Sequence, residues 1–107
     1  MKLSSHKISL ENWTNLTQKQ QLLNLAAELA RISLSMNRYG SQDRLVKESL
    51  ERAFDLVDLI LQDPRWKKQS LEWRYFRDGL SLLYLGKADA LIAKFFYTWL
   101  INFSENL

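Results

Sequence analysis

Residues 41–62 read SQDRLVKESLERAFDLVDLILQ and carry the most regular hydropathy pattern in the chain. Their apolar residues recur at intervals of three and four, the spacing that gathers side chains on one face of an α-helix. The pattern predicts an amphipathic helix that is capped by Ser41 or Asp43 and ends near Gln62. The apolar face comprises Val46, Leu50, Ala53, Phe54, Val57, Ile60 and Leu61, and the opposite face carries Lys47, Glu48, Glu51, Arg52, Asp55 and Asp58.

The preceding segment, from Gln18 to Arg38, predicts a longer helix with one dominant apolar face. Thr17 and Gln20 have the spacing of a capping box, in which each side chain accepts a hydrogen bond from the other residue's backbone amide. Gly40 supplies the stop, because glycine readily adopts the conformations that end helices. The dominant face comprises Leu22, Leu25, Ala26, Leu29, Ile32, Ser33 and Met36.

A third helix is predicted from Pro64 to about Leu85, with Asp63 as its N-cap. Proline suits the first position of a helix, where its missing amide hydrogen costs nothing. Gly86 marks the end, and Gly79 in the interior predicts a close approach by a neighbouring helix. The main apolar stripe comprises Trp66, Trp73, Phe76, Leu80, Leu83 and Tyr84.

The fourth predicted helix, about Ala88 to Phe103, is apolar on nearly every side. One side holds Leu91, Ile92, Phe95, Phe96, Trp99 and Phe103, and the other holds Ala93, Tyr97, Leu100 and Ile101. The first of these sides is expected to face the core.

No segment shows the alternation of a β-strand, so the expected fold is all-α. Four helices joined by short connections favour an antiparallel up-and-down four-helix bundle. Residues 17–107 are expected to form this single domain, preceded by a short irregular arm of residues 1–16. One helical turn is expected near Leu10 to Trp13, with Trp13 and Leu16 docking the arm on the bundle.

The composition is that of an ordinary globular domain: 107 residues, 47% apolar and 25% charged, with a net charge of +3. The absence of cysteine excludes disulfides, thiolate nucleophiles and cysteine-based metal sites. Residues 1–7 lack the apolar run of a signal peptide, and no apolar window reaches the roughly 18 residues of a membrane span. A cytoplasmic protein with no membrane span is therefore expected.

The third and fourth helices carry more apolar surface than one bundle core requires. A second stripe on residues 64–85 lies apart from the main one, and an exposed patch of this size is rare in a monomer. Self-association, with a symmetric dimer favoured, is therefore expected. The alternatives are a fourth helix wrapped on all sides by the others, a groove for a foreign helix, or a membrane surface. The predicted interface comprises Leu71, Tyr75, Leu82, Leu85, Tyr97 and Ile101.

Residues 65–77 read RWKKQSLEWRYFR and combine five basic residues with four aromatic ones. These are the two ingredients of a platform for single-stranded nucleic acid. Three of the rings share the core stripe, however, which leaves a basic patch that is either a solvated face or a phosphate-contacting surface. Its members are Arg65, Lys67, Lys68, Arg74 and Arg77, of which Arg77 is also placed to pair with a carboxylate of the preceding helix.

No catalytic constellation is present, so no enzyme, cofactor or metal is expected. His6 is the single histidine and has no rigid nucleophile beside it. Acidic residues recur along residues 48–58 at a spacing that could hold Mg²⁺. Lys47 and Arg52 interleave with them, however, which is typical of a solvated, salt-bridged helix face.

Three motifs together resemble a group of short bacterial α-helical proteins of about this length. They are Glu11-Asn12-Trp13 with Leu16-Thr17 and Gln20-Gln21-Leu22, then Leu50-Glu51-Arg52-Ala53, and Asp63-Pro64-Arg65-Trp66-Lys67. The resemblance implies a bacterial cytosolic protein and brings no activity with it. The expected function is a non-enzymatic helical interaction or accessory module that self-associates through its last two helices and binds another macromolecule, which is expected to be a protein. The alternative is a nucleic-acid-binding accessory protein that uses the basic face of residues 65–77.

Overall fold

The computed structural model describes residues 8–107. This part of the chain contains five α-helices, one 3₁₀ helix and no strand, so the prediction of an all-α fold is confirmed. The elements are α1 (Leu10–Thr14), α2 (Gln18–Tyr39), α3 (Arg44–Gln62), the 3₁₀ helix η2 (Pro64–Gln69), α4 (Ser70–Tyr84) and α5 (Ala90–Glu105).

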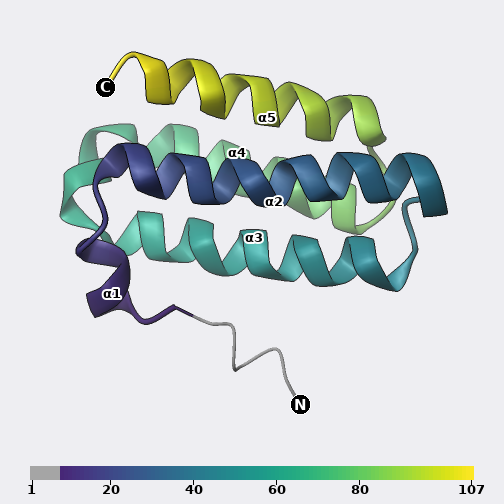
Figure 1. The fold of residues 1–107 in the computed structure, drawn as a ribbon, viewed down its shortest axis with the longest axis horizontal. Helices are drawn as coiled ribbons and strands as arrows, with labels where there is room; N and C mark the ends of the chain where they lie inside the picture. The colour runs from purple at the N-terminus through teal and green to yellow at the C-terminus, as the bar shows by residue number, and fades with distance from the viewer. Residues whose placement is uncertain (1–7) are drawn as a thin grey trace.

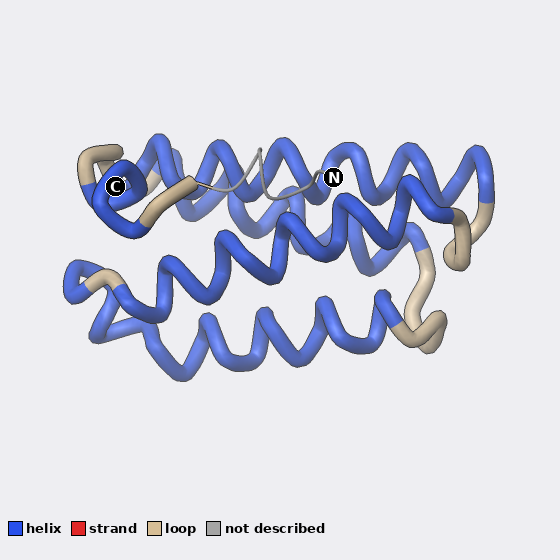
Figure 2. Tube along the Cα trace, turned by 90° about the horizontal axis from the view of Figure 1, so that it is seen from below, coloured by secondary structure: helices blue, strands red, loops and turns tan. Residues whose placement is uncertain are grey.

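The four longer helices lie side by side, and consecutive ones run in opposite directions (Figure 1). α2 packs against both α3 and α5, and α3 also packs against α4. The connecting loops lie at the two ends of the helices (Figure 2). The radius of gyration over the Cα atoms is 13.2 Å, close to the roughly 13 Å of a compact chain of this length.

Local sequence signals set the ends of α2 and α3 as predicted. Thr17 Oγ1 accepts from the Gln20 amide at 3.0 Å, and the Thr17 amide donates to Gln20 Oε1 at 2.8 Å, which completes the capping box. Asp43 caps α3, because its carboxylate accepts from the Leu45 amide at 2.9 Å. Gly40 ends α2 with a φ of 93°, a conformation that a larger residue would adopt only with strain.

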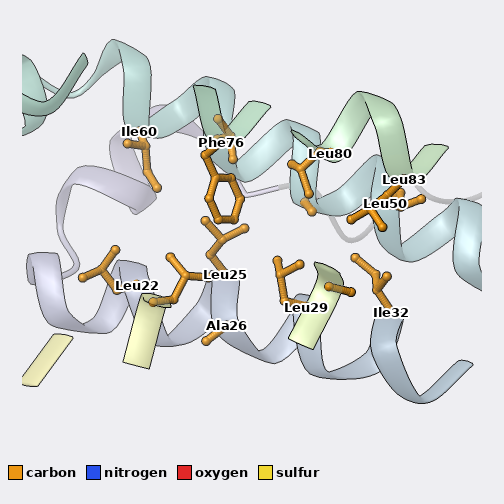
Figure 3. Packing of buried hydrophobic residues seen from close by; sticks show 14 of the residues in the cluster. Leu22, Leu25, Ala26, Leu29, Ile32, Leu50, Ile60, Phe76, Leu80 and Leu83 are labelled. Atoms are coloured by element: carbon orange, nitrogen blue, oxygen red, sulfur yellow. The ribbon is translucent and has the colours of Figure 1, made fainter. Parts of the chain in front are cut away.

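The core forms where the apolar faces of α2, α3 and α4 meet. Leu25 and Leu29 of α2 point toward Phe76 and Leu80 of α4, with Leu50 of α3 alongside (Figure 3). The fully buried large side chains are Trp13, Leu22, Leu25, Leu29, Ile32, Leu50, Ile60, Trp66, Trp73, Leu80, Leu83 and Leu100. They come from every helix, so each element contributes to one continuous core.

The predicted helix from Pro64 to Leu85 is wrong in its first third, where the chain forms η2 before α4 begins. Short 3₁₀ segments are common at helix N-termini. Here one long-range hydrogen bond joins the segment to α2, since Trp66 Nε1 donates to Gln21 Oε1 at 2.6 Å. Asp63 is its local N-cap, and its Oδ1 accepts from the Arg65 amide at 3.0 Å. The indole of Trp66 is therefore buried with its N–H group hydrogen-bonded to the Gln21 side chain.

The same glutamine also holds the N-terminal arm. Gln21 is fully buried, and its Nε2 donates to the Trp13 carbonyl at 2.8 Å and to Asp63 Oδ2 at 3.0 Å. The indole of Trp13 is fully buried in the core, and Arg65 Nη2 donates to the Thr14 carbonyl at 3.1 Å. Gln21 thus joins α1, α2 and the corner between α3 and η2.

Candidate interaction surface

The second stripe predicted on residues 64–85 lies at the surface of α4. Leu71, Tyr75, Leu82 and Leu85 are 58%, 66%, 48% and 63% exposed. At 100° per residue, these positions fall within an arc of about 80° on the helix. The four side chains therefore form one apolar strip along α4 that no other described element covers.

The exposed apolar residues of α5 are not the ones that the sequence indicated. Leu91 and Phe95 are 71% and 64% exposed, and Ile92 is also exposed, although all three were expected to face the core. Ala93 and Leu100, expected on the other side, are fully buried. The reason is that α5 packs against α2 as well as beside α4, so its buried face is turned toward α2.

Tyr97 and Ile101 are accordingly not part of the exposed surface. Both are half-buried and pack against the core. At 100° per residue they lie on the opposite side of α5 from Trp99, which faces α4 through its ring contact with Trp73. The structure thus brings together the four predicted residues of α4 and separates them from the two predicted residues of α5.

We use the term α4/α5 surface for the seven exposed side chains along these two helices. They are Leu71, Tyr75, Leu82, Leu85, Leu91, Ile92 and Phe95. Because Leu91 and Phe95 are exposed, α5 is not wrapped on all sides by the other helices. The polar residues Lys94, Thr98 and Asn102 recur every four residues and mark the side of α5 that faces solvent. Leu91 and Phe95 lie next to these positions on the helix, so the sequence contained a clue that they would be exposed.

A groove runs between the two helices within this surface. Its central part has a volume of about 280 Å³ and is lined by Glu72, Tyr75, Phe76, Phe95, Phe96 and Trp99. It continues toward the α4–α5 connection as a shallow hollow lined in part by Gly79, Leu82, Leu91 and Phe96. The central part is thus mainly apolar, with Glu72 at its edge, whereas the hollow near the α4–α5 connection is also lined by Ser41, Lys87 and Asp89.

Gly79 allows the ring of Phe96 to lie directly on α4. A Cβ atom at position 79 would stand 2.3 Å from Phe96 Cζ, well inside contact distance. The Phe96 ring also packs on Phe76 with centroids 4.7 Å apart. The close approach of a neighbouring helix predicted from Gly79 is thus found only as contact with a side chain of α5.

Buried aromatic rings form the support beneath the groove. The ring of Trp73 lies 5.4 Å from that of Trp66, 5.5 Å from that of Trp99 and 5.6 Å from that of Phe76. Trp66, Trp73 and Phe76 are at most 4% exposed, which confirms that these rings cannot stack on bases. Such interlocked rings give the groove a rigid base.

Two of the five predicted phosphate-contacting residues are engaged within the chain. Arg65 Nη2 pairs with Asp63 Oδ2 at 2.7 Å, and Arg77 Nε donates to Asp58 Oδ1 at 2.8 Å. The pairing of Arg77 with a carboxylate of the preceding helix was predicted. The Arg77 guanidinium also lies 5.1 Å from the centre of the Phe54 ring, so it is held by both groups.

The other three basic residues project into solvent. Lys67, Lys68 and Arg74 are exposed, and none of them pairs with an acidic group among residues 8–107. They form a smaller basic patch than the five-residue patch the sequence suggested.

Asp63 is the one carboxyl group whose pKa the surroundings move strongly. The hydrogen bonds from the Arg65 side chain lower its pKa from 3.8 to about 2, opposed by burial and reinforced by the bond from Gln21. The same contact raises the pKa of Arg65. This carboxylate is a structural cap and hydrogen-bond partner, because all its contacts are to groups of the fold.

A cavity of about 210 Å³ between α2 and α3 is lined in part by a buried glutamate. Glu28 is 7% exposed, and its carboxylate binds Arg31 Nη2 at 2.6 Å and Arg52 Nε at 3.2 Å. Two arginines thus compensate the one buried charge. Two of the acidic residues along residues 48–58 also form ion pairs. Glu48 pairs with Arg44, and Asp58 pairs with Arg77.

The described residues contain no group of three or more His, Asp or Glu side chains placed to bind one metal ion. His6 lies outside the described residues. Within residues 8–107, no helix combines the length and the apolar character needed to cross a bilayer. Comparisons with protein-family models, with curated proteins and with solved structures found no match to this chain.

Proposed function

We propose that this chain is a non-enzymatic interaction module, built on an antiparallel four-helix bundle of α2 to α5, that self-associates through the α4/α5 surface and binds another macromolecule. The observation that supports the proposal is the large apolar content of this surface, which the exposed Asp78 interrupts on α4. Seven large side chains, 39% to 71% exposed, lie along two adjacent helices. Soluble monomers rarely expose more than about 300–600 Å² of contiguous apolar area.

The energetics favour covering this surface. Each square ångström of apolar area removed from water contributes about 25 cal/mol. The charged residues of α2 and α3 stand in contrast, since Glu28 binds Arg52 across the two helices at 3.2 Å. The exposed part of the α4/α5 surface has no such internal partner among residues 8–107, and a second protein surface would supply one.

Light scattering after size-exclusion chromatography tests the proposal. We expect the protein to elute as a multiple of its 12.7 kDa chain mass. The double variant Tyr75→Glu with Leu82→Glu is expected to elute at the single-chain mass, because it places two charges on the apolar strip of α4. A helical circular dichroism spectrum of that variant would show that it is folded.

Leu34→Glu is the matched control. Leu34 is 70% exposed on α2, outside the α4/α5 surface, so its replacement adds a charge at a comparable apolar position. Its mass should equal that of the wild type. A monomeric wild type, or a double variant that assembles normally, would contradict the proposal.

A second candidate function, nucleic-acid binding, is supported by the exposure of Lys67, Lys68 and Arg74 without acidic partners among the described residues. Binding through phosphates weakens steeply with salt, and the slope of log K against log[salt] decreases in magnitude by roughly 0.7–0.9 for each phosphate no longer neutralised. We expect replacement of all three by alanine to flatten that dependence. Replacement of Lys19, Arg38 and Arg44 removes the same charge elsewhere and should leave it nearly unchanged; equal effects would sink this candidate.

A further inference from the structure

The exposed strip of α4 reads nearly the same in both directions. Leu71 and Leu85 stand seven residues on either side of Asp78, and Tyr75 and Leu82 stand three and four residues from it. All five residues are exposed. A two-fold interface needs such a self-complementary surface, because each protomer presents the same patch to the other.

We infer that two copies of this chain pair through α4 in antiparallel orientation, with the two-fold axis at Asp78. This inference rests on the proposed self-association and specifies its geometry. In this register, Leu71 packs against Leu85 of the partner subunit, and Tyr75 packs against Leu82 of the partner subunit.

The charges at the strip fit the same register. At 100° per residue, Asp78 falls within the arc of the strip, and Arg74 lies about 40° from it, just outside the arc. In the antiparallel pair, Arg74 lies about 6 Å along the axis from Asp78 of the partner subunit, within reach of its side chain. Two symmetric Arg74–Asp78 pairs would therefore form across the axis.

Both groups are available for this contact. Neither Arg74 nor Asp78 forms an ion pair within residues 8–107. Asp78 has Arg77 as its sequence neighbour and contributes to the raised pKa of that residue, but the Arg77 guanidinium is held mainly by Asp58. The two-fold axis places the Asp78 carboxylates of the two subunits against each other, and an Arg74 guanidinium on either side offsets that repulsion.

The groove gives Tyr75 a place to dock. In the antiparallel register, Tyr75 lies over the hollow of the partner subunit, at the level of residues 79 to 82. In this chain that hollow is lined in part by Leu82, Leu91 and the ring of Phe96, which fills the space beside Gly79. An aromatic anchor in an apolar hollow is the common form of a dominant interface contact.

The seven side chains of the α4/α5 surface, each 39% to 71% exposed, are the apolar groups available to such a contact. A standard-sized interface buries about 800 Å² per partner. Phe95 lies beside Phe96, which contacts α4 at Gly79, and so sits near the level of the axis. Its exposed ring extends the contact beyond α4 itself.

Charge variants test the cross-axis pairs. Arg74→Asp leaves only acidic groups at the axis, and Asp78→Arg leaves only basic ones, so each variant alone should raise the dimer dissociation constant about tenfold or more. In a mixed dimer of the two variants, an aspartate faces an arginine in both contacts between position 74 of one subunit and position 78 of the other. We expect the mixture to form mixed dimers whose affinity returns to within a few-fold of the wild type. A mixture that associates no better than either variant would overturn the register.

Cysteine pairs test the orientation, since the natural chain has no cysteine. Leu71→Cys and Leu85→Cys, mixed and mildly oxidised, should form a mixed disulfide. Leu71→Cys alone should not, because its two copies would lie about 21 Å apart along the axis, far beyond disulfide reach. Efficient self-linking of Leu71→Cys, or the absence of the mixed disulfide in a dimer, would overturn the inference.

These outcomes separate self-association from its geometry. A wild-type protein that is monomeric at every concentration would refute the proposed self-association together with this geometry. A dimer that Tyr75→Glu with Leu82→Glu dissociates, but that fails the mixing and disulfide tests, would refute only the antiparallel pairing about Asp78.

Discussion

α2 and α3 differ from α4 and α5 in how they treat their outward faces. The first pair buries one apolar face, pairs Glu28 with Arg31 and Arg52, and exposes separate large apolar residues such as Leu34. The second pair also buries an apolar face, but its exposed residues Tyr75 and Phe95 line one groove between the two helices. Stability alone does not require these exposed groups. This difference is the basis of our proposal that α4 and α5 present a surface to a partner.

Truncation of a buried leucine on α2 is expected to cause the largest loss of unfolding free energy and tests whether α2 mainly stabilises the fold. Leu29 is fully buried, so Leu29→Ala should cost about 3 kcal/mol of unfolding free energy, as cavity-forming substitutions do. Leu34→Ala on the same helix should cost less than about 0.5 kcal/mol, because that side chain is 70% exposed. Urea unfolding of both variants measures the difference, and comparable losses would break the contrast.

The second effect concerns the corner that both halves share. The Asp63 carboxyl has its pKa lowered to about 2 in the folded chain, against 3.8 for the free group. Its contribution is therefore fully present above about pH 4 and is lost as the pH falls from about 4 to 2. The shift corresponds to a loss on the order of 2 kcal/mol.

Asp63→Asn isolates this contribution, because asparagine can still cap the helix but does not titrate. The loss of unfolding free energy between pH 5 and about pH 2.5 should be smaller in the variant than in the wild type. An unchanged pH slope would show that other carboxyl groups dominate acid destabilisation.

A methyl group at position 79 is expected to act more weakly and sharpens the description of the groove. Gly79→Ala forces Phe96 off α4, which costs about 1–3 kcal/mol as overpacking, while the helix gains about 1 kcal/mol from alanine. We expect a net loss near 1 kcal/mol by thermal or urea unfolding, the difference between these two effects. Adding Phe96→Leu should remove the clash, so in that background Gly79→Ala should become neutral or stabilising.

The smallest expected effect comes from the ion pair between α3 and α4. The side chains of Arg77 and Asp58 are 43% and 45% exposed, so solvent screens their attraction. A double-mutant cycle with Arg77→Met and Asp58→Asn should give a coupling of at most about 1 kcal/mol, decreasing with salt. A larger coupling energy that does not depend on salt would mean that this ion pair stabilises the packing of α3 on α4 more than a solvent-exposed pair can.

The helix ends could be predicted because they depend on neighbouring residues. Thr17 with Gln20, and Asp43 before Leu45, form their caps within three residues of chain. The η2 segment could not be predicted in this way, because it depends on the contact between Trp66 and Gln21, which are 45 positions apart. Local patterns thus located the helices. The 3₁₀ geometry of η2, in contrast, accompanies a contact with Gln21 that is distant in the sequence.

The candidate surface was predictable on α4 and not on α5. On α4, polar and charged residues separate two apolar stripes, so the outer stripe of Leu71 and Tyr75 stands out in the sequence. On α5, apolar residues surround almost the whole helix, and their chemical character does not distinguish the side that meets α2 from the side that meets water. The spacing of Lys94, Thr98 and Asn102 is the remaining clue to its orientation.

The Gln21 side chain has a consequence for how the molecule opens. One amide group joins the Trp13 carbonyl, the Asp63 carboxylate and the Trp66 indole, which belong to three separate stretches of chain. None of the three can leave without exposing the unsatisfied groups of the others. In a hydrogen-exchange experiment, the amides of α1 and η2 should therefore become accessible together, as one cooperative unit at a single end of the protein.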